Sequence, residues 1–298
     1  MSYSPSLYAS AYYWFHVVSA LPEAIMIGKT CLITGANSGI GKETARGLAE
    51  LGARVVLVCR NPQRGESAKE DIVRRSGSGS VDLLLADLSS LQEVRGLAER
   101  VVERYERLHV LVNNAGLFRL RWSRTVDGFE TTFAVNHLAP FLLTNLLLEL
   151  LKKSAPSRIV NVSSVSHYGG HIDFEKLRAG RAGSGMGGYS NSKLALVLFT
   201  YELARRLRGT GVTVNCLHPG AVATNIWRVP TWLTRLFMAS AEKGAETPIF
   251  LASAPEIEMA TGKYFDSGEA KKSSEESYDN QVAERLWHLS AELVGLGR

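Results

Sequence analysis

Cysteine is scarce in this chain of 298 residues. The three cysteines, Cys31, Cys59 and Cys216, are odd in number, widely separated and each set in an apolar, strand-like run. No C-x-x-C pair occurs, and His167 and His171 have no second pair of residues at zinc-binding spacing. These absences argue against a disulfide framework and against a metal site. We therefore expect reduced, buried cysteines in a protein of a reducing compartment.

Long hydrophobic runs are missing as well. The apolar stretch LYASAYYWFHVVSAL covers residues 7–21, short of the roughly 20 residues that span a bilayer. It lacks the basic flank of a secretory signal peptide. Its tyrosines and Trp14 suit a membrane interface, where an apolar ring and a polar tip are both satisfied. We expect residues 1–27 either to associate with a membrane or to pack as a helix on the protein's own surface.

Charge is modest, and no basic stripe with interleaved aromatic residues occurs, which argues against a nucleic-acid partner. The content of 45% hydrophobic and 21% charged residues is typical of a globular chain and not of a disordered or polytopic membrane protein. The net charge of +5 suits a polyanionic cofactor or an anionic membrane surface.

Short apolar runs alternate with helical patterns from Lys29 onward, as parallel strands joined by crossover helices require. The pattern predicts strands at 29–34, 54–59, 81–86, 109–113, 158–163, 212–217 and 262–265. It predicts helices near 40–51, 64–75, 91–107, 128–152, 188–208, 242–252 and 279–294, with a linker over 266–281. The expected fold is a single Rossmann-type, doubly wound α/β domain over 28–298, with a parallel sheet of about seven strands covered by helices on both faces.

A glycine-rich turn, TGANSGIG, follows the first expected strand and opens a helix. Gly35, Gly39 and Gly41 permit a tight turn, a close approach of the backbone to a pyrophosphate and close packing of the helix. The helix N-terminus adds unpaired N–H groups and a positive dipole. Strand, glycine turn and helix together predict dinucleotide binding.

The end of the second expected strand distinguishes the two nicotinamide dinucleotides. NAD sites place a carboxylate there for the ribose 2′-hydroxyl, whereas this sequence has Cys59 and Arg60. Arg60, helped by Lys42, can pair with a 2′-phosphate in charge-assisted bonds. The expected cofactor is therefore NADP(H); the alternative is that Arg60 is a solvated loop cation.

Seven motifs in order resemble the classical short-chain dehydrogenase/reductase family from about Gly28 to the C-terminus. They are TGANSGIG (34–41), ADL (86–88), NNAG (113–116), FAVNHLA (133–139), VNVSS (160–164), YSNSK (189–193) and HPGAVAT (218–224). Within the family, segments such as GIGKETARGLAELGARVVLVCR and HIDFEKL resemble the vertebrate retinol dehydrogenases that reduce retinal with NADPH. The resemblance implies an oxidoreductase that transfers a hydride between NADP(H) and a lipophilic carbonyl or alcohol.

The resemblance assigns catalysis to Asn136, Ser164, Tyr189 and Lys193. Tyr189 and Lys193 lie one helical turn apart, so the ammonium is expected to lower the pKa of the phenol that donates the proton. Ser164 would hold the substrate oxygen, while Ser163 would point to the opposite face of the strand. Asn136 would hold a water in a proton relay; a purely structural hydrogen bond is the alternative.

The same resemblance implies a set of cofactor contacts along the carboxyl ends of the strands. Asp87 would meet the adenine edge, Lys193 the nicotinamide ribose and Thr224 the carboxamide. The full expected set is Gly35, Asn37, Ser38, Gly39, Ile40, Gly41, Lys42, Arg60, Asp87, Leu88, Asn114, Ala115, Gly116, Tyr189, Lys193, Pro219, Gly220, Val222 and Thr224.

Two segments between the motifs bear on the substrate: the glycine-rich stretch 178–188 and the apolar stretch 227–240. The second lies where the family has a substrate lid, expected here over about 225–241, and its tryptophans suit a long apolar substrate. Retinal or retinol is the favoured substrate. A steroid or a lipid aldehyde is the alternative, and a cofactor-bound scaffold protein is disfavoured because the catalytic residues are retained.

The expected partners are a small lipophilic substrate and a membrane surface. The expected location is a membrane facing the cytosol, that of the endoplasmic reticulum being favoured, with the cytoplasm as the alternative. The resemblance also leaves open a homodimer formed through the helices that carry Asn136 and Tyr189.

Overall fold

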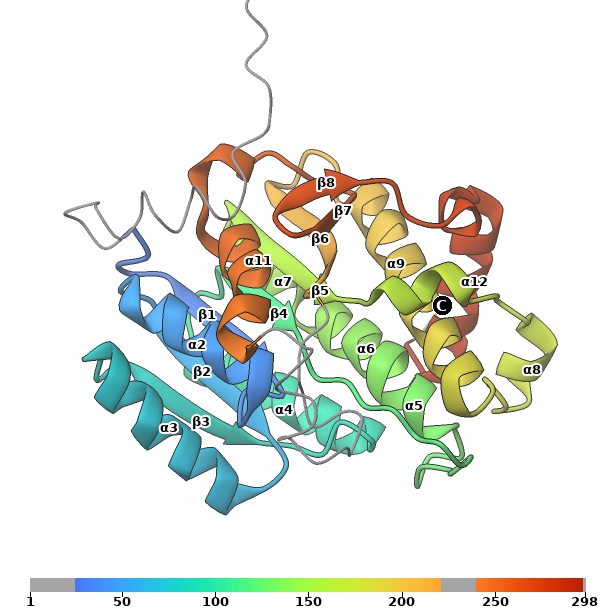
Figure 1. Ribbon diagram of the computed structural model, residues 1–298, viewed down its shortest axis with the longest axis horizontal. Coiled ribbons are helices and arrows are strands. Elements are labelled where there is room, and N and C mark those ends of the chain that lie inside the picture. The colour runs from blue at the N-terminus through green and yellow to red at the C-terminus, as the bar shows by residue number, and fades with distance from the viewer. Residues whose placement is uncertain (1–24, 221–239, 297–298) are drawn as a thin grey trace, which may run out of the picture.

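Eight strands form one sheet in the order β3-β2-β1-β4-β5-β6-β7-β8. The computed structural model in Figure 1 describes residues 25–220 and 240–296. The strands are β1 (Thr30–Thr34), β2 (Arg54–Cys59), β3 (Val81–Leu85), β4 (Val110–Asn113), β5 (Ser157–Val162), β6 (Val212–His218), β7 (Lys263–Asp266) and β8 (Glu269–Lys271). Neighbours from β3 to β7 pair in parallel, and β8 pairs antiparallel with β7. The predicted doubly wound α/β fold is confirmed.

Helices cover both faces of this sheet (Figure 1). One face carries α2 (Gly39–Glu50), α3 (Pro62–Ser76) and α11 (Ala241–Ser253). The other carries α4 (Leu91–Arg104), α6 (Ala139–Leu146), α7 (Leu148–Lys153), α9 (Gly185–Arg206) and α12 (Asn280–Leu293). Shorter helices are α5 (Thr131–Phe133), the π-helix η1 (Ala134–Leu138), η2 (Val165–Gly169), α8 (Phe174–Arg178), η4 (Pro255–Ile257) and η5 (Glu275–Tyr278).

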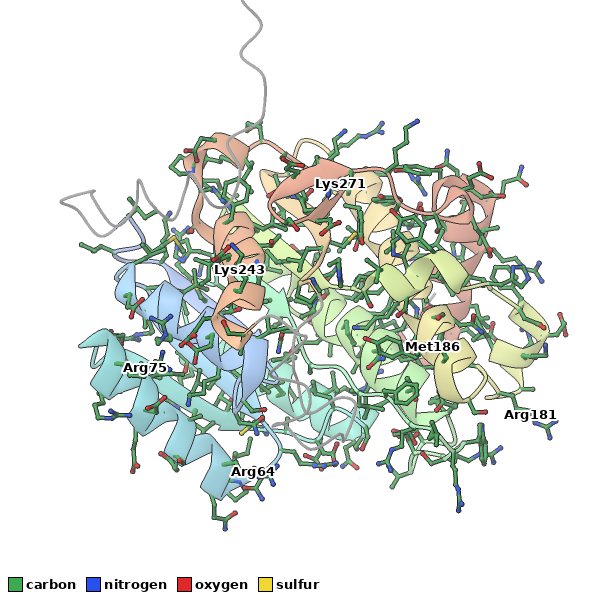
Figure 2. The ribbon with its side chains drawn as sticks, viewed as in Figure 1. Arg64, Arg75, Arg181, Met186, Lys243 and Lys271 are labelled. Atoms are coloured by element: carbon green, nitrogen blue, oxygen red, sulfur yellow. The ribbon has the colours of Figure 1, made fainter. Side chains whose placement is uncertain are left out.

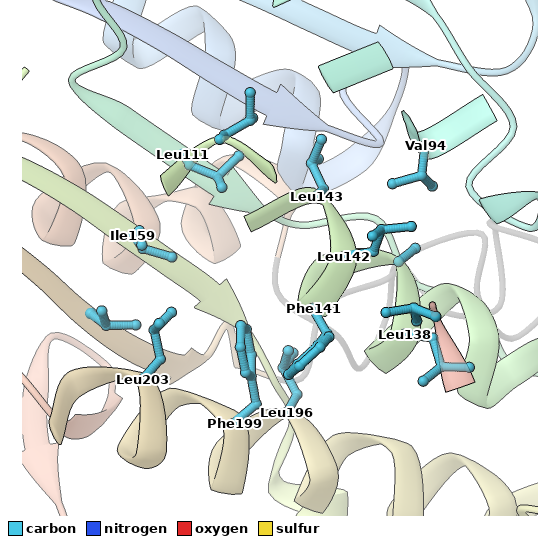
Figure 3. Packing of buried hydrophobic residues seen from close by; sticks show 14 of the residues in the cluster. Val94, Leu111, Leu138, Phe141, Leu142, Leu143, Ile159, Leu196, Phe199 and Leu203 are labelled. Atoms are coloured by element: carbon cyan, nitrogen blue, oxygen red, sulfur yellow. The ribbon is translucent and has the colours of Figure 1, made fainter. Parts of the chain in front are cut away.

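Apolar side chains alternate between two cores because successive strand residues point to opposite faces. Leu32 of β1 lies in the core beneath α4, α6 and α9, whereas Ile33 lies in the core beneath α2 and α11. Figure 3 shows the first of these cores, where Phe141 of α6 and Phe199 of α9 lie beside Ile159 of β5. Cys31, Cys59 and Cys216 are free and buried, as predicted.

Helix α12 covers the outer side of α9 and α6. The Trp287 ring packs on Phe141 and Phe199, with ring centroids 5.0 and 5.9 Å away, and Leu286 is buried. The apolar stripe predicted for this helix therefore packs against the core.

The C-terminal segment is more ordered than its composition predicts. Residues 266–281 have the composition of a linker, but they contain β8 and η5. Hydrogen bonds between side chains hold this segment in place, since it has few apolar residues to bury. The hydroxyls of Tyr201 and Ser277 each bond the Ser273 hydroxyl, and the Ser273 N–H donates to the Tyr278 hydroxyl. The linker prediction was wrong because serine and tyrosine hydroxyls replace hydrophobic burial here.

The helix predicted over 128–152 is interrupted. It begins at Thr131, where the Glu130 carboxylate accepts from the N–H groups of Thr132 and Phe133. It then passes through the π-helical turn η1 and breaks again at Leu147. A π-helical turn is a recurrent feature of functional sites, and this one contains Asn136.

Candidate active site

The glycine turn that joins β1 to α2 is packed so closely against its neighbours that Gly35 and Gly41 leave no room for a Cβ atom. Gly35 has a φ of +66°, in the left-handed region, and a Cβ there would lie 2.9 Å from Ala115 Cα. A Cβ on Gly41 would lie 2.3 Å from Asn114 Nδ2 and 2.6 Å from the Gly35 carbonyl oxygen. The first turn of α2 thus sits directly against the loop that follows β4.

Asn114 connects the ends of β1 and β4, where the strand order changes direction. Its side-chain amide donates to the Thr34 carbonyl oxygen at 2.7 Å, and its N–H donates to the Thr34 hydroxyl at 3.0 Å. The N–H of Ala115 donates to the same hydroxyl at 3.0 Å. Ligands of open α/β sheets bind at this switch in strand order.

A cavity of about 850 Å³ opens along this edge of the sheet. At the glycine turn it is lined by Gly35, Asn37, Ser38, Gly39, Ile40 and Gly41. Farther along it meets Arg60, Asp87, Leu88, Asn114, Ala115, Gly116 and the 117–123 loop. Ser38 precedes α2 and its side chain makes no cap bond, so the helix N-terminus faces the cavity without a side-chain acceptor. Most of the expected cofactor contacts therefore lie around one cavity.

Cations gather at the end of β2. Arg60 is 70% exposed, and its Nη1 lies 3.3 Å from Asp87 Oδ2. Burial opposes ionisation of Asp87, but hydrogen bonds from Ser89 and the charge of Arg60 outweigh it, so the pKa of Asp87 lies below its usual value. Lys42 forms an ion pair with Asp71 at 2.6 Å and is not among the described residues that line the cavity.

Arg64 is a cavity residue that the sequence analysis missed. It lies in the first turn of α3, where its N–H donates to the capping Asn61 side chain at 2.8 Å, and Figure 2 labels it at this end of the helix. The signal was present in the sequence: Arg64 follows Arg60 by four residues, across an Asn-Pro helix start.

Tyr189, Lys193 and Ser164 come together behind this cavity. Phe118, which lines the cavity, meets the Tyr189 ring edge-on, with centroids 5.8 Å apart. A Cβ on Gly116 would lie 3.3 Å from Lys193 Nζ. The Ser164 side chain lies close enough to the Tyr189 hydroxyl to lower its pKa, and Lys193 Nζ donates to the Val162 carbonyl oxygen at 2.9 Å.

Burial dominates the electrostatics of these groups. It raises the pKa of Tyr189, which the hydrogen bond from Ser164 only partly offsets. It also lowers the pKa of Lys193 to about 8, so the ammonium still predominates at pH 7. The expected lowering of the Tyr189 pKa by Lys193 is not observed. Lys193 Nζ lies 5.6 Å from the Tyr189 ring centroid and donates to the Val162 carbonyl oxygen instead.

Asn136 is buried in η1, and its side-chain amide is fully engaged. Oδ1 accepts from the Leu117 N–H at 2.9 Å, while Nδ2 donates to the Leu117 carbonyl and to Ser192 Oγ, both at 3.0 Å. Ser192 in turn donates to the Tyr189 carbonyl at 2.7 Å. The amide thereby ties the cavity loop to the helix that carries Tyr189, and its part in a proton relay stays a prediction.

The two serines after β5 point to different partners. Ser163 is buried and its hydroxyl donates to the Lys193 carbonyl at 3.0 Å, whereas Ser164 faces Tyr189. His167 holds the Ser164 backbone: its Nδ1 donates to the Ser164 carbonyl at 2.7 Å, and its Nε2 accepts from the Ser274 N–H at 3.2 Å. From the sequence, His167 was considered only as a metal ligand, because the contact with Ser274 joins residues more than one hundred positions apart.

Several predicted segments lie outside the described residues. They are the apolar stretch 7–21, most of the lid expected over about 225–241, Val222 and Thr224, whereas Ser240 and Ala241 cap and open α11. Pro219 and Gly220 are described and follow β6, and Gly220 has a φ of +85°. Among the described helices, none is long and apolar enough to cross a membrane.

Comparison with known proteins agrees with this geometry. The family model described as short chain dehydrogenase matches residues 29–230. Human retinol dehydrogenase 13 is 46% identical over 287 residues, covering 92% of this chain and 87% of that one. An uncharacterised protein of Mycobacterium paratuberculosis superposes with a TM-score of 0.77 at 35% identity, covering 93% and 96% of the two chains. The NADP complex of RhlG from Pseudomonas aeruginosa has a TM-score of 0.64 at 28% identity, covering 83% and 97%.

The match spans more than half of the chain, and the relatives share nearly half of their residues with it. The chain belongs to the short-chain dehydrogenase family, as an oxidoreductase of CH–OH donors that is similar to retinol dehydrogenases.

Proposed function

We propose that this protein transfers a hydride between NADP(H) and a lipophilic carbonyl or alcohol, with Asn136, Ser164, Tyr189 and Lys193 as the catalytic set and retinal as the favoured substrate. The observation that carries the proposal is the placing of the half-buried Ser164 next to the buried Tyr189, beside the Lys193 ammonium and behind the glycine-turn cavity. A phenol, a hydroxyl and a cation at one point can hold a carbonyl oxygen and give it a proton.

The residues present fit a dinucleotide. The glycine turn presents backbone without side chains at the start of α2, and the cavity extends from there past Gly116, which abuts Lys193. The 12-residue helix α2 points its N-terminus at the part of the cavity that would hold a pyrophosphate. Lys193 would hold the nicotinamide ribose, and Asp87 the adenine edge.

Preference for NADP(H) is supported by the cations at the end of β2. Arg60 and Arg64 both line the cavity, and within the described lining the single carboxylate, Asp87, already bonds Arg60 and Ser89. Two guanidinium groups suit a 2′-phosphate, since each can donate two N–H bonds to one phosphate. A related solved structure was determined with NADP.

The raised pKa of Tyr189 fits a proton donor in the direction of reduction. Its phenol stays protonated at neutral pH and can protonate the substrate oxygen while Ser164 holds that oxygen by a hydrogen bond. Bound NADPH would supply the hydride to the carbonyl carbon. For the Lys193 ammonium to stabilise the phenolate that remains, its Nζ would have to turn from the Val162 carbonyl toward the Tyr189 oxygen, and burial of both groups would strengthen that interaction. In the reverse direction the Tyr189 phenolate must accept the proton of the alcohol, so the rate of alcohol oxidation should increase with pH.

A lipophilic substrate is supported by the retinol dehydrogenase relatives and by the apolar lid expected over about 225–241. Association with a cytosol-facing membrane, that of the endoplasmic reticulum being favoured, is proposed through residues 7–21. A homodimer through the helices that carry Asn136 and Tyr189 stays a prediction.

A substrate panel tests this function. Purified protein is incubated with NADPH or NADH and with retinal, a steroid ketone or a long-chain aldehyde, and cofactor oxidation is measured. We expect the highest kcat/KM with retinal and NADPH. A higher value with the steroid ketone or the aldehyde would replace the substrate assignment, and a preference for NADH would overturn the cofactor assignment.

A further inference from the structure

Two loops lie side by side at the carboxyl edge of the sheet. One is the 117–127 segment between β4 and α5, which projects at the lower right of Figure 1. The other precedes and opens α9. The Gly185 N–H donates to the Arg119 carbonyl oxygen at 3.1 Å, and a Cβ on Gly180 would lie 2.9 Å from the Gly128 carbonyl oxygen. The two loops therefore present one continuous surface.

Large apolar side chains stand exposed on this surface. Leu120 is 77% exposed, Val126 87%, Met186 49% and Trp122 45%. Such exposure is costly in water unless something covers it, and clustered apolar residues mark interaction sites. We call the surface the basic rim and define it as Arg119, Leu120, Arg121, Trp122, Arg124, Val126, Arg181 and Met186.

The same rim carries four arginines and little negative charge, so the expectation that no basic stripe with interleaved aromatic residues occurs was wrong at residues 119–124. Among the described residues, Arg119, Arg121, Arg124 and Arg181 are exposed and form no ion pair. The Arg124 guanidinium lies over the Trp122 ring, 5.2 Å from its centroid. The nearby acids are engaged elsewhere: Asp127 accepts from the Leu91 N–H and Glu130 caps α5.

We propose that the basic rim docks on an anionic lipid membrane. Protruding apolar tips among arginines have the chemistry of an interfacial contact, in which the tips enter the acyl boundary and the cations meet lipid phosphates. Trp122, an aromatic residue with one polar N–H, suits the depth of the headgroups. Figure 2 shows Arg181 and Met186 on the same side of the molecule as the projecting loop.

The position of the rim explains what docking would achieve. Residues 119–122 both belong to the rim and line the outer part of the cavity. A membrane on the rim therefore faces the mouth of the cavity, where a lipophilic molecule can pass from lipid without crossing water. This consequence rests on the proposed function, whereas lipid binding by the rim does not. Charge complementarity favours anionic lipid over other occupants, because the rim joins four arginines to apolar tips, while the carboxylate of its loop, Asp127, follows the last of these tips and accepts from the Leu91 N–H.

Vesicle binding of the full chain tests the proposal. The probes are phosphatidylcholine vesicles with and without about one-third phosphatidylserine, and the readout is the ratio of the two partition constants. Residues 7–21 carry no charged side chain, so they should not distinguish these vesicles. We expect the wild type to prefer the anionic vesicles, and R119Q/R121Q/R124Q to lose most of that preference, at roughly fivefold per arginine or about 100-fold in all.

The matched control is K153Q/R208Q/K263Q. These three exposed cations lie outside the strands' carboxyl edge, next to the starts of β5, β6 and β7, and should leave the ratio unchanged. L120S/V126S should weaken binding to both vesicle types, whereas V102S/M259S, which removes two other exposed apolar residues, should not.

Thermal unfolding checks that every variant is folded. An equal loss of preference for anionic vesicles in R119Q/R121Q/R124Q and in K153Q/R208Q/K263Q would overturn the proposal, because the net positive charge of the protein would then account for the binding. A wild type that shows no preference for anionic vesicles, or that binds a soluble polyanion such as heparin but not vesicles, would overturn it as well.

Discussion

Gly41 determines at the residue scale how closely α2 approaches the loop after β4. The space that a Cβ would occupy is taken by Asn114 Nδ2 and by the backbone oxygen of Gly35. Asn114 cannot move freely, because its amide bonds the Thr34 carbonyl oxygen and so fixes the end of β1. One absent side chain therefore sets the geometry of the cradle that we assign to the pyrophosphate.

Gly41→Ala is expected to destabilise the protein by about 1–3 kcal/mol, the usual cost of overpacking, and to weaken NADPH binding more than tenfold in a fluorescence titration. Gly79→Ala is the matched control, since nothing lies within 4 Å of the added Cβ. Unchanged NADPH affinity in Gly41→Ala would contradict the role of the cradle.

Arg60 tests the cofactor assignment. Arg60→Asp places a negative charge beside the expected 2′-phosphate and should raise the KM for NADPH by about 10–100-fold, the loss of one charge-assisted bond, with a far smaller change for NADH. Arg64→Gln should act in the same direction more weakly. Arg208→Asp, at an exposed arginine outside the cavity lining, controls for general charge. Equal effects of Arg60→Asp on both cofactors would rule out this assignment.

At the scale of elements, His137 joins η1 to α12. Its Nε2 lies 2.8 Å from Ser290 Oγ, and its ring packs among Phe133, Phe141 and Phe199. Complete burial lowers its pKa to about 3, so the ring is neutral in the folded protein over most of the acid range. Protonation must therefore disrupt the contact between the two elements.

The sign of the pH effect follows from this lowered pKa. Between pH 6.5 and about 3 the unfolded chain binds a proton at His137 that the folded chain does not, so stability falls as pH falls through this window. The contribution approaches about 1.4 kcal/mol per pH unit. His137→Gln keeps a hydrogen-bonding side chain without titration.

Chemical denaturation at pH 7 and pH 5 measures this contribution. We expect the loss of unfolding free energy between the two pH values to be smaller in His137→Gln than in the wild type. The buried His167 also has a lowered pKa, and His167→Gln serves as a second comparison. An identical loss in wild type and His137→Gln would show that His137 does not titrate as described.

For the molecule as a whole, the fold could be predicted from the sequence because its strands are apolar on both faces and its glycine turn follows a strand directly. The shared placement of Tyr189 and Lys193 on α9 could be predicted because their spacing is local to one helix. The position of Ser164 after β5 could be predicted from its motif at the end of a strand. In each case the informative residues lie within a few positions of one another.

What could not be predicted depends on contacts between distant residues. His167 holds Ser164 through a segment more than one hundred residues away, and Asn136 is engaged by Leu117 and Ser192. Lys42 was expected at the cofactor, but a carboxylate on α3 pairs with it. The Tyr189 pKa also depends on burial, which no sequence spacing reports.

The most direct test of the central claim is NADPH oxidation by wild type and Tyr189→Phe with retinal, together with NADPH affinity measured by fluorescence. The account predicts that removing the hydroxyl lowers kcat by about 10²–10⁴-fold, the usual contribution of a positioned general acid, while NADPH still binds within about tenfold of the wild type. Phenylalanine keeps the ring that packs on Phe118. Turnover by Tyr189→Phe at the wild-type rate would contradict the account.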